Sequence, residues 1–232
     1  HLVQSDGFEY INILKNKRGN SKFSIIFSVL KRNLKLIPII LKFKPSLMIS
    51  TDATIAQLGK IFNIQRITIT EDDYEIIKPL ANVSYPITNY ILCPNVCNVG
   101  KFNNKKIGYD GYMKLAYLHP NVFKVNEKIK QTYNLPSKFA LIRLAQLTAF
   151  HDKGIKGIST DFLDKIIANL ESKNITPVIS SEYKTESKYH KYILKINPTD
   201  IHNILNSACV LICDSQSMSV EASMLGIPSL RY

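Results

Sequence analysis

The sequence predicts an α/β protein built from two Rossmann-like, doubly wound parallel sheets. Segments with strand and helix patterns alternate along the chain, which is typical of parallel sheets covered by helices. The clearest strand candidate, Val210–Cys213, is a continuous apolar run suited to a parallel strand buried on both faces. The chain has 232 residues, of which 45% are hydrophobic, so it is globular and can bury a sizeable core.

Segments with strand and helix patterns alternate through the first half. The expected strands are Phe8–Ile13, Leu47–Ser50, Arg66–Thr70, Tyr90–Cys93 and a last segment within Gly108–Tyr112. The expected helices are Ser21 to about Lys42, Ala53–Phe62 and Tyr74–Leu80. The first helix is predicted from one apolar stripe, formed by Ile25, Ile26, Val29, Leu30 and Leu34. Pro38 should kink or break this helix, because proline lacks the backbone N–H.

The alternation starts again after His119-Pro120, which predicts domains 1–120 and 121–232. The second set of elements is helix Asn126–Tyr133, strand Phe139–Leu144, loop Ala145–Gly157, helix Thr160–Lys173, strand Thr176–Ser180 and helix Thr199–Asn206. Both domains are expected to be incomplete. The chain enters at what corresponds to a third element of a Rossmann-like domain, and it stops just after the strand that follows Pro228.

The segment after Ala208 carries the strongest functional signal. Strand Val210–Cys213 leads into a polar turn at Asp214–Ser217 and a helix at Ser217–Leu225, which Gly226 and Pro228 end. A helix start offers free N–H groups and the positive end of the helix dipole, and both favour a bound diphosphate. The hydroxyl side chains predicted to join them are Ser215, Ser217 and Ser219.

Glu221 lies one turn into this helix and could bind the vicinal hydroxyls of a sugar. An alternative needs no ligand. In that case the segment is an ordinary strand, turn and helix, and Ser217 or Ser219 only caps the helix.

The motifs in this segment resemble a known class. Asp214-Ser215, Glu221-Ala222 and Leu225-Gly226-Ile227-Pro228 are similar to the nucleotide-sugar segment of UDP-N-acetylglucosamine 2-epimerases and related glycosyltransferases of the two-Rossmann-domain B fold. A longer resemblance, to the domain-of-unknown-function 354 family, runs from Lys31–Pro45 through Gly111–Pro120 to the terminal motif.

The resemblance implies a glycosyltransferase-like enzyme. Its second half would bind a nucleotide-diphosphate sugar, with the serines on the diphosphate and Glu221 on the ribose. Its first half would hold the acceptor, in surface polysaccharide or glycoconjugate synthesis.

A nucleotide-sugar epimerase is the enzymatic alternative, but two departures weaken it. Gln216-Ser217 replaces the Gly-Gly of the epimerase turn, and Arg143 to His151 contains no counterpart of the epimerase His-Arg segment. A third alternative belongs to a different functional class: the protein could be a nucleotide-binding or assembly subunit that has no catalytic activity.

Two further candidates lie after the strand Phe139–Leu144. Arg143 could bind a diphosphate bidentately, or it could form an ion pair with an acid such as Asp152. His151 could shuttle a proton or donate to a phosphate, or it could be a solvated loop residue. Asp214 is expected to order its turn rather than to act in catalysis.

Three acids of the first half follow strands and are candidate catalytic groups. Asp52 could be a general base toward an acceptor hydroxyl, or the N-cap of its helix. Glu71 and Asp72, with Asp73, form a cluster in which crowded carboxylates raise one another's pKa, which suits acid-base chemistry. Such clusters also simply start helices.

The charge indicates an anionic partner. The net charge is +12 and the isoelectric point about 9.4, which suits a nucleotide phosphate, a nucleic acid or a membrane surface. Nucleic acid is disfavoured, because the sequence has no aromatic-rich sheet, helix-turn-helix spacing or arginine-rich arm. The basic helix Ser21–Lys44 could lie on anionic lipid, or it could be a packed helix with a solvated charged face.

We expect no metal and no cofactor. The pairs Cys93/Cys97 and Cys209/Cys213 invite a zinc hypothesis, but metal ligands usually lie on loops. Cys209 and Cys213 are instead expected to share one face of a buried strand. No apolar run approaches the roughly 20 residues that span a bilayer, and the start lacks a signal-peptide layout. We therefore expect a cytoplasmic protein without disulfides. The lipid alternative for the basic helix would place it peripherally at the inner face of the membrane.

Overall fold

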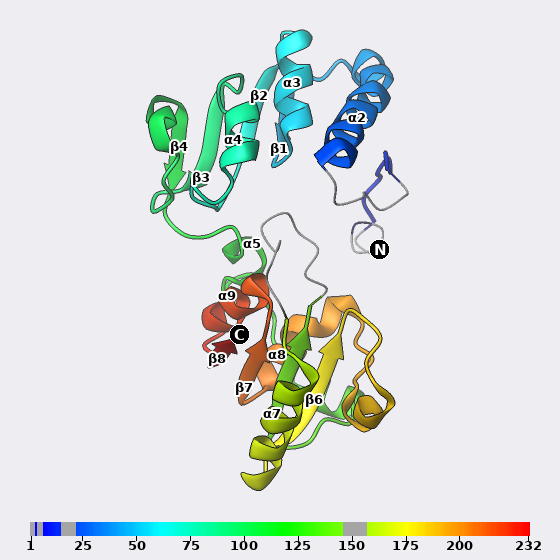
Figure 1. Ribbon diagram of the computed structural model, residues 1–232. Helices are drawn as coiled ribbons and strands as arrows, with labels where there is room; N and C mark the ends of the chain where they lie inside the picture. The colour runs from blue at the N-terminus through cyan, green and yellow to red at the C-terminus, as the bar shows by residue number, and fades with distance from the viewer. Residues whose placement is uncertain (1–2, 4–6, 15–21, 146–156) are drawn as a thin grey trace. The chain divides into compact units, whose positions relative to one another are not determined.

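The chain forms two compact units, Val3–Met113 and Lys114–Tyr232, in a computed structural model that describes residues 3, 7–14, 22–145 and 157–232. In the described residues each unit contains a four-stranded sheet in which all strands are parallel (Figure 1). The strand orders are β1-β2-β3-β4 and β6-β5-β7-β8. The predicted fold class is therefore confirmed. The units divide a few residues before the predicted boundary at His119-Pro120.

The first unit alternates strands and helices as predicted. Its strands are β1 (Leu47–Ser50), β2 (Gln65–Ile69), β3 (Tyr90–Pro94) and β4 (Lys106–Tyr109). Its helices are α2 (Lys22–Phe43), α3 (Ala53–Ile61) and α4 (Lys78–Ser84), with a 3-10 segment at Gly100–Lys105.

The second unit has the same alternation with shorter helices. Its strands are β5 (Phe139–Leu144), β6 (Thr176–Ser181), β7 (Val210–Cys213) and β8 (Ser229–Arg231). Its helices are α5 (Leu115–Leu118), α6 (Ile129–Thr132), α7 (Thr160–Ser172), α8 (Ile201–Ser207) and α9 (Gln216–Met224). Two 3-10 segments, Ser187–Tyr192 and Pro198–Asp200, precede α8.

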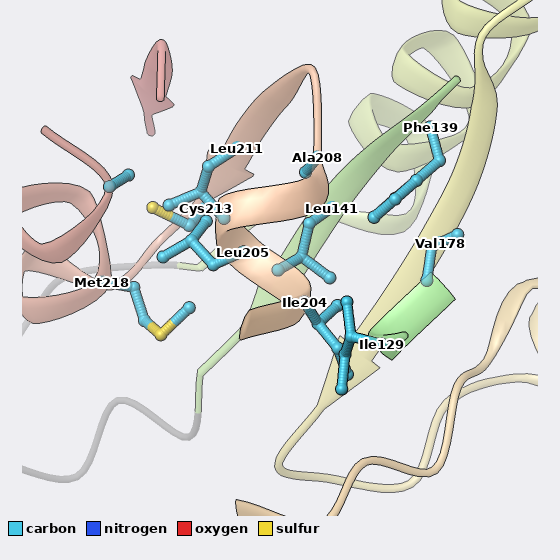
Figure 2. Close-up of a cluster of buried hydrophobic side chains, with 11 residues drawn as sticks. Ile129, Phe139, Leu141, Val178, Ile204, Leu205, Ala208, Leu211, Cys213 and Met218 are labelled. Atoms are coloured by element: carbon cyan, nitrogen blue, oxygen red, sulfur yellow. The ribbon is translucent and has the colours of Figure 1, made fainter. Parts of the chain in front are cut away.

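Both faces of the second sheet are buried, as the apolar run of β7 predicted. Phe139, Leu141 and Leu211 face a cluster that includes Leu205 of α8 and Met218 of α9 (Figure 2). The alternate residues of the same strands face the other side, where they meet α7. They are Ala140, Ile142, Leu144 and Ile212. A strand with helices on both faces can be apolar at every position, so β5 and β7 carry no polar side chain before their carboxyl ends.

Two predictions in the first unit were wrong. Phe8–Ile13 forms no strand, and Phe8 and Ile11 are 68% and 60% exposed, so a strand there would bury little. The helix expected from Tyr74 begins only at Lys78. The backbone N–H of Tyr74 is bonded to the carbonyl of Asn98, and the first turn of the helix instead accommodates Pro79.

Helix α2 also differs from its prediction. It continues through Pro38 to Phe43 without a break. Pro38 is exposed, so the carbonyl that loses its partner can bond to water. The helix packs through Leu36, Ile37 and Ile40 against Met48 and Leu58. Leu30 and Leu34, from the predicted stripe, are exposed instead.

The cysteine prediction holds for one residue of its pair. Cys213 is fully buried in β7. Cys209 precedes β7 and is exposed, with its Sγ 3.0 Å from the carbonyl of Phe139, so the expectation of a shared buried face was wrong.

We predict that Leu141→Ala destabilises the second unit by about 2–5 kcal/mol, because it leaves a cavity in a fully buried strand. Val122→Ala is the matched control, since Val122 is 55% exposed in the same unit. Urea unfolding followed by circular dichroism measures both variants. Equal losses would show that β5 is not the centre of the core.

Candidate functional site

The parallel pairing of β5 and β7 brings several predicted residues to one edge of the second sheet. Arg143 is the register partner of Cys213, so the carboxyl ends of both strands lie side by side. Ser215 follows Cys213 by two residues and begins the turn into α9. In open α/β sheets ligands bind at this edge.

The start of α9 is built as an N-cap. The side chain of Ser215 accepts a hydrogen bond from the backbone N–H of Met218 at 3.4 Å, and the helix begins at Gln216. The cap is therefore Ser215, not Ser217 or Ser219, and the turn is shorter than predicted. The N–H groups of Gln216 and Ser217 belong to the first turn, where a helix has no acceptors of its own.

The three predicted serines have different surroundings. Ser215 caps α9, and Ser217 is exposed in its first turn. The hydroxyl of Ser219 lies 2.9 Å from that of Ser229, so Ser219 ties α9 to β8. Gly226, with φ of +73°, ends the helix as predicted, because this backbone conformation favours glycine.

Asp214 was expected to order its own turn, but its carboxylate instead binds two distant residues at this edge of the sheet. Its carboxylate is buried and accepts hydrogen bonds from the N–H groups of Ala145, at 2.7 Å, and Ile158, at 3.3 Å. These two residues flank residues 146–156, which lie outside the described residues. The predicted residue His151 falls in that range, and so does Asp152.

The guanidinium of Arg143 is held by β6 and the residue that follows it. It donates to the hydroxyl of Ser180 at 2.6 Å and forms an ion pair with Glu182. The ion-pair alternative is confirmed, with Glu182 as the partner where Asp152 was expected. A role on a diphosphate stays a prediction.

Glu221 is the buried carboxylate of α9, with 8% of the residue exposed. Its Oε1 accepts a hydrogen bond of 2.8 Å from the hydroxyl of Tyr117, and its Oε2 lies 3.3 Å from Nε2 of His202. The rings of Tyr117 and His202 are also in contact, with centroids 5.3 Å apart. We call Tyr117, His202 and Glu221 the Glu221 triad.

The triad keeps Glu221 ionised. Burial would raise the pKa of its carboxyl, but the bonds from His202 and Tyr117 and the charge of Lys114 lower it below the ordinary value of 4.5. A depressed folded pKa stabilises the fold at every pH above 4.5. That contribution is lost as the pH falls through the lower folded pKa.

The first unit contains a cavity of about 180 Å³ at the carboxyl end of β2. Glu71 and Asp72 line it, as do Tyr85 and Met113. The remaining lining residues are Thr51, Thr68, Ile69, Thr70, Ile77 and Leu80. Asp73 points elsewhere, because its Oδ1 accepts from the N–H of Asn98 at 2.7 Å. The structure thus brings Glu71 and Asp72 together in one hollow.

Tyr85 is a polar group of this cavity that the sequence did not reveal. The residue is fully buried, and its hydroxyl has no hydrogen-bond partner within the described part of the chain. Burial raises its pKa to about 12, although the nearby Thr70 side chain opposes this rise. The hydroxyl is therefore a neutral donor at physiological pH.

Asp52 is confirmed as the N-cap of α3. Its Oδ1 accepts from the N–H of Thr54 at 2.8 Å, and its Oδ2 forms an ion pair with Arg32 of α2. Both oxygens thus have a partner that stabilises the charged form. Action as a general base stays a prediction.

Sequence reasoning missed both partners of Glu221. Tyr117 lies in the stretch Gly111–Pro120, which had been noted only for its resemblance to a family. The structure shows that this stretch contacts the terminal motif through the hydroxyl of Tyr117. His202 carried no sequence signal, because a single histidine in a short helix is common.

Comparison with known proteins supports the fold. No protein-family model matches the sequence, and no curated protein matches it. Solved structures of the same architecture do match. UDP-GlcNAc 2-epimerase from Methanocaldococcus jannaschii is 14% identical with a TM-score of 0.66, over 98% of this chain and 71% of that one.

Two further structures extend the comparison. UDP-GlcNAc 2-epimerase from Neisseria meningitidis bound to UDP-GlcNAc is 13% identical with a TM-score of 0.69, over 99% of this chain and 70% of that one. The glycotransferase of kitacinnamycin is 12% identical with a TM-score of 0.59, over 99% of this chain and 69% of that one. The chain therefore has the glycosyltransferase B fold. A relation to the domain-of-unknown-function 354 family stays a prediction from the motifs.

We predict that Tyr117→Phe raises the pKa of Glu221, because the carboxylate loses a hydrogen bond in a buried place. Carbon-13 NMR titration of the glutamate carboxyls measures the change. Tyr232→Phe is the control, since the ring of Tyr232 packs against Phe162 and its hydroxyl is not among the partners of Glu221. A Glu221 pKa that is the same in wild type and Tyr117→Phe would contradict the assignment.

A second prediction concerns Asp214. In Asp214→Asn one carboxylate acceptor becomes an amide donor, so one of the two loop bonds is lost, at a cost of about 1–3 kcal/mol. Hydrogen exchange at the amides of Ala145 and Ile158 should become faster. Unchanged protection at both amides would show that Asp214 does not hold Ala145 and Ile158.

Proposed function

We propose that this protein is an enzyme that binds a nucleotide-diphosphate sugar through its second unit and transfers the sugar to an acceptor. The observation that carries the proposal is the segment from β7 to α9. It combines a capped helix start, which suits a diphosphate, with an ionised carboxylate further along the same helix. Glu221 is five positions after Gln216, a rise of about 7 Å along the helix axis.

The arrangement of Glu221 fits a sugar diol. Each carboxylate oxygen has two lone pairs, and Tyr117 and His202 each engage one oxygen. By lone-pair count each oxygen can accept a second hydrogen bond, so the proposal has the two hydroxyls of a ribose bind there beside Tyr117 and His202. The fold supports the same reading, because a structure of this fold was solved with UDP-GlcNAc bound.

The departing diphosphate needs stabilisation of its developing charge. The positive end of α9 supplies part of it, together with the N–H groups of Gln216 and Ser217 and the exposed hydroxyl of Ser217. Arg143, at the same edge, would add a cation when its pairing with Glu182 loosens. Ser215 would support the site by capping α9, and Ser219 would support it through its hydrogen bond to Ser229 of β8.

For the acceptor we propose the cavity of the first unit. Its walls are apolar at Ile77 and Leu80 and polar at Glu71, Asp72 and Tyr85, which fits a hydroxylated ring with one apolar face. We favour Glu71 or Asp72 as the base that deprotonates the acceptor hydroxyl. Asp52 and His151 remain further candidates, and Asp52 would first have to exchange its bond with Arg32. No step of this chemistry requires a metal or a cofactor.

As the setting we propose surface polysaccharide or glycoconjugate synthesis at the cytoplasmic face of a membrane. Epimerisation of a nucleotide sugar is the alternative, since structures of this fold include UDP-GlcNAc 2-epimerases. The products separate the two activities. A transferase releases nucleoside diphosphate only when an acceptor is present, whereas an epimerase returns an isomeric nucleotide sugar without an acceptor. Nucleotide binding without either product would indicate an assembly subunit.

We predict that one of UDP, GDP, CDP and dTDP raises the thermal stability of the protein. A ligand at 100 times its dissociation constant adds about 2.7 kcal/mol, which differential scanning fluorimetry detects. Glu221→Gln should reduce the shift, because the amide loses the charge that accepts the diol. The control is Glu127→Gln, which alters an exposed glutamate of the same unit. No shift with any nucleotide would contradict the donor site.

We also predict that Asp72→Asn or Glu71→Gln lowers the turnover number by about 100-fold or more, as expected when a general base is removed. Nucleotide binding should stay as in wild type, because both residues lie in the first unit. The control is Asp110→Asn, an exposed acid of that unit. Full activity in both variants would remove the cavity acids from the mechanism.

A further inference from the structure

Helix α2 has one packed face, and its other face has no apolar packing partner among the residues that the structure describes. On the packed face Ile40 is 5% exposed and contacts the cluster that contains Met48 and Leu58. Polar contacts with α3 strengthen this packing, because Asn33 donates to Gln57 at 2.8 Å and Arg32 pairs with Asp52. The orientation of α2 on its unit is therefore fixed.

The opposite face carries large apolar side chains in contact with solvent. Phe27, Leu30, Leu34 and Leu41 are 66%, 53%, 60% and 57% exposed. They are three, four and seven positions apart, and this spacing places them on one side of a helix. Four exposed large side chains in one line differ from the scattered single residues that most surfaces show. We call these four residues the α2 stripe.

Lysines follow the α2 stripe along one flank. Lys31, Lys35 and Lys42 each come one position after a leucine of the stripe, and all three are exposed, although Nζ of Lys35 donates to the carbonyl of Ile13 at 2.7 Å. The exposed face is thus divided lengthwise into an apolar half and a basic half. The charge is not offset locally, because the sequence has no Asp or Glu between Glu9 and Asp52.

We propose that the α2 stripe docks the protein onto an anionic lipid membrane. The four apolar side chains would enter the boundary between headgroups and acyl chains, and the lysines would reach lipid phosphates. The charge of the lysines favours a membrane over a second copy of the chain as the partner. Two copies that met through their stripes would place their lysine rows near one another, and like charges repel.

The helix lies on the membrane and does not cross it. No helix in the described part of the chain is long and apolar enough to span a bilayer. Lysines near an anionic leaflet each add to the attraction, and salt screens it. The docking surface belongs to the first unit and the proposed nucleotide site to the second, and the docking proposal does not depend on the proposed enzymatic function.

The test is co-sedimentation of the whole chain with lipid vesicles. One set contains phosphatidylcholine alone, and the other contains about one third phosphatidylglycerol, which supplies the anionic surface. Wild type is expected in the pellet only with the anionic vesicles, and less of it at high salt. Equal binding to both sets, or no binding to either, would overturn the proposal.

Paired variants assign the binding to its residues. Leu30→Ser with Leu34→Ser should weaken vesicle binding by about tenfold or more, as should Lys31→Glu with Lys42→Glu. The matched controls are Ile61→Ser with Val96→Ser, both 73% exposed away from the stripe, and Lys60→Glu with Lys173→Glu. Controls should bind within about twofold of wild type.

Two results with these variants would also overturn the proposal. The first is that the stripe variants bind anionic vesicles as tightly as the controls do. The other is self-association in gel filtration that the stripe variants abolish, in a protein that does not bind vesicles, since that would assign the stripe to a second copy. Circular dichroism melting of each variant confirms that it is folded.

Discussion

The parallel pairing of β5 with β7 is the constraint on which the candidate nucleotide site depends. It sets Arg143 beside Cys213, and the next residues along the chain are then delivered to the same edge of the sheet. Burial on both faces keeps the register, because a slip by one residue would exchange the side chains of the two apolar clusters. The polar residues appear only where the strands end, and this is the place at which a ligand can approach.

Two buried carboxylates then organise this edge in different ways. Asp214 accepts hydrogen bonds from the backbone N–H groups of Ala145 and Ile158. Glu221 accepts from two side chains and stays ionised. A buried acid without such partners would take up a proton, so the partners are what preserve the negative charge. Side chains thus hold the charge of Glu221, whereas backbone N–H groups hold the carboxylate of Asp214.

The sequence predicted the strands well because parallel strands are short apolar runs, and Phe139–Leu144 and Val210–Cys213 appear with the expected bounds. Local patterns were less informative where a distant residue decides the outcome. The start of α4 depends on a bond between Tyr74 and Asn98, and the partner of Arg143 comes from Glu182, 39 positions away. Asp52 could be assigned in advance, since its role as a cap follows from a neighbour in the chain, whereas the partners of Asp214 are 69 and 56 positions away.

The candidate sites show the same contrast between features set by neighbouring residues and features set by distant ones. The hydroxyl-rich start of α9 is local and was predicted, although the cap proved to be Ser215. The Glu221 triad joins residues 104 positions apart, and Tyr85 reaches the acidic cavity through tertiary packing. Neither could be found by spacing. Pairings of this kind depend on the register of the sheets, which the sequence implies only in outline.

The most direct test of the account is NMR titration of the protein with nucleoside diphosphates, followed at the backbone amides of Gln216 and Ser217. The account predicts that one nucleotide shifts these two amides in a saturable way, together with the side-chain signals of Tyr117 and His202. If no nucleoside diphosphate or nucleotide sugar shifts the α9 amides, the second unit does not bind a nucleotide at this helix, and the central claim is wrong.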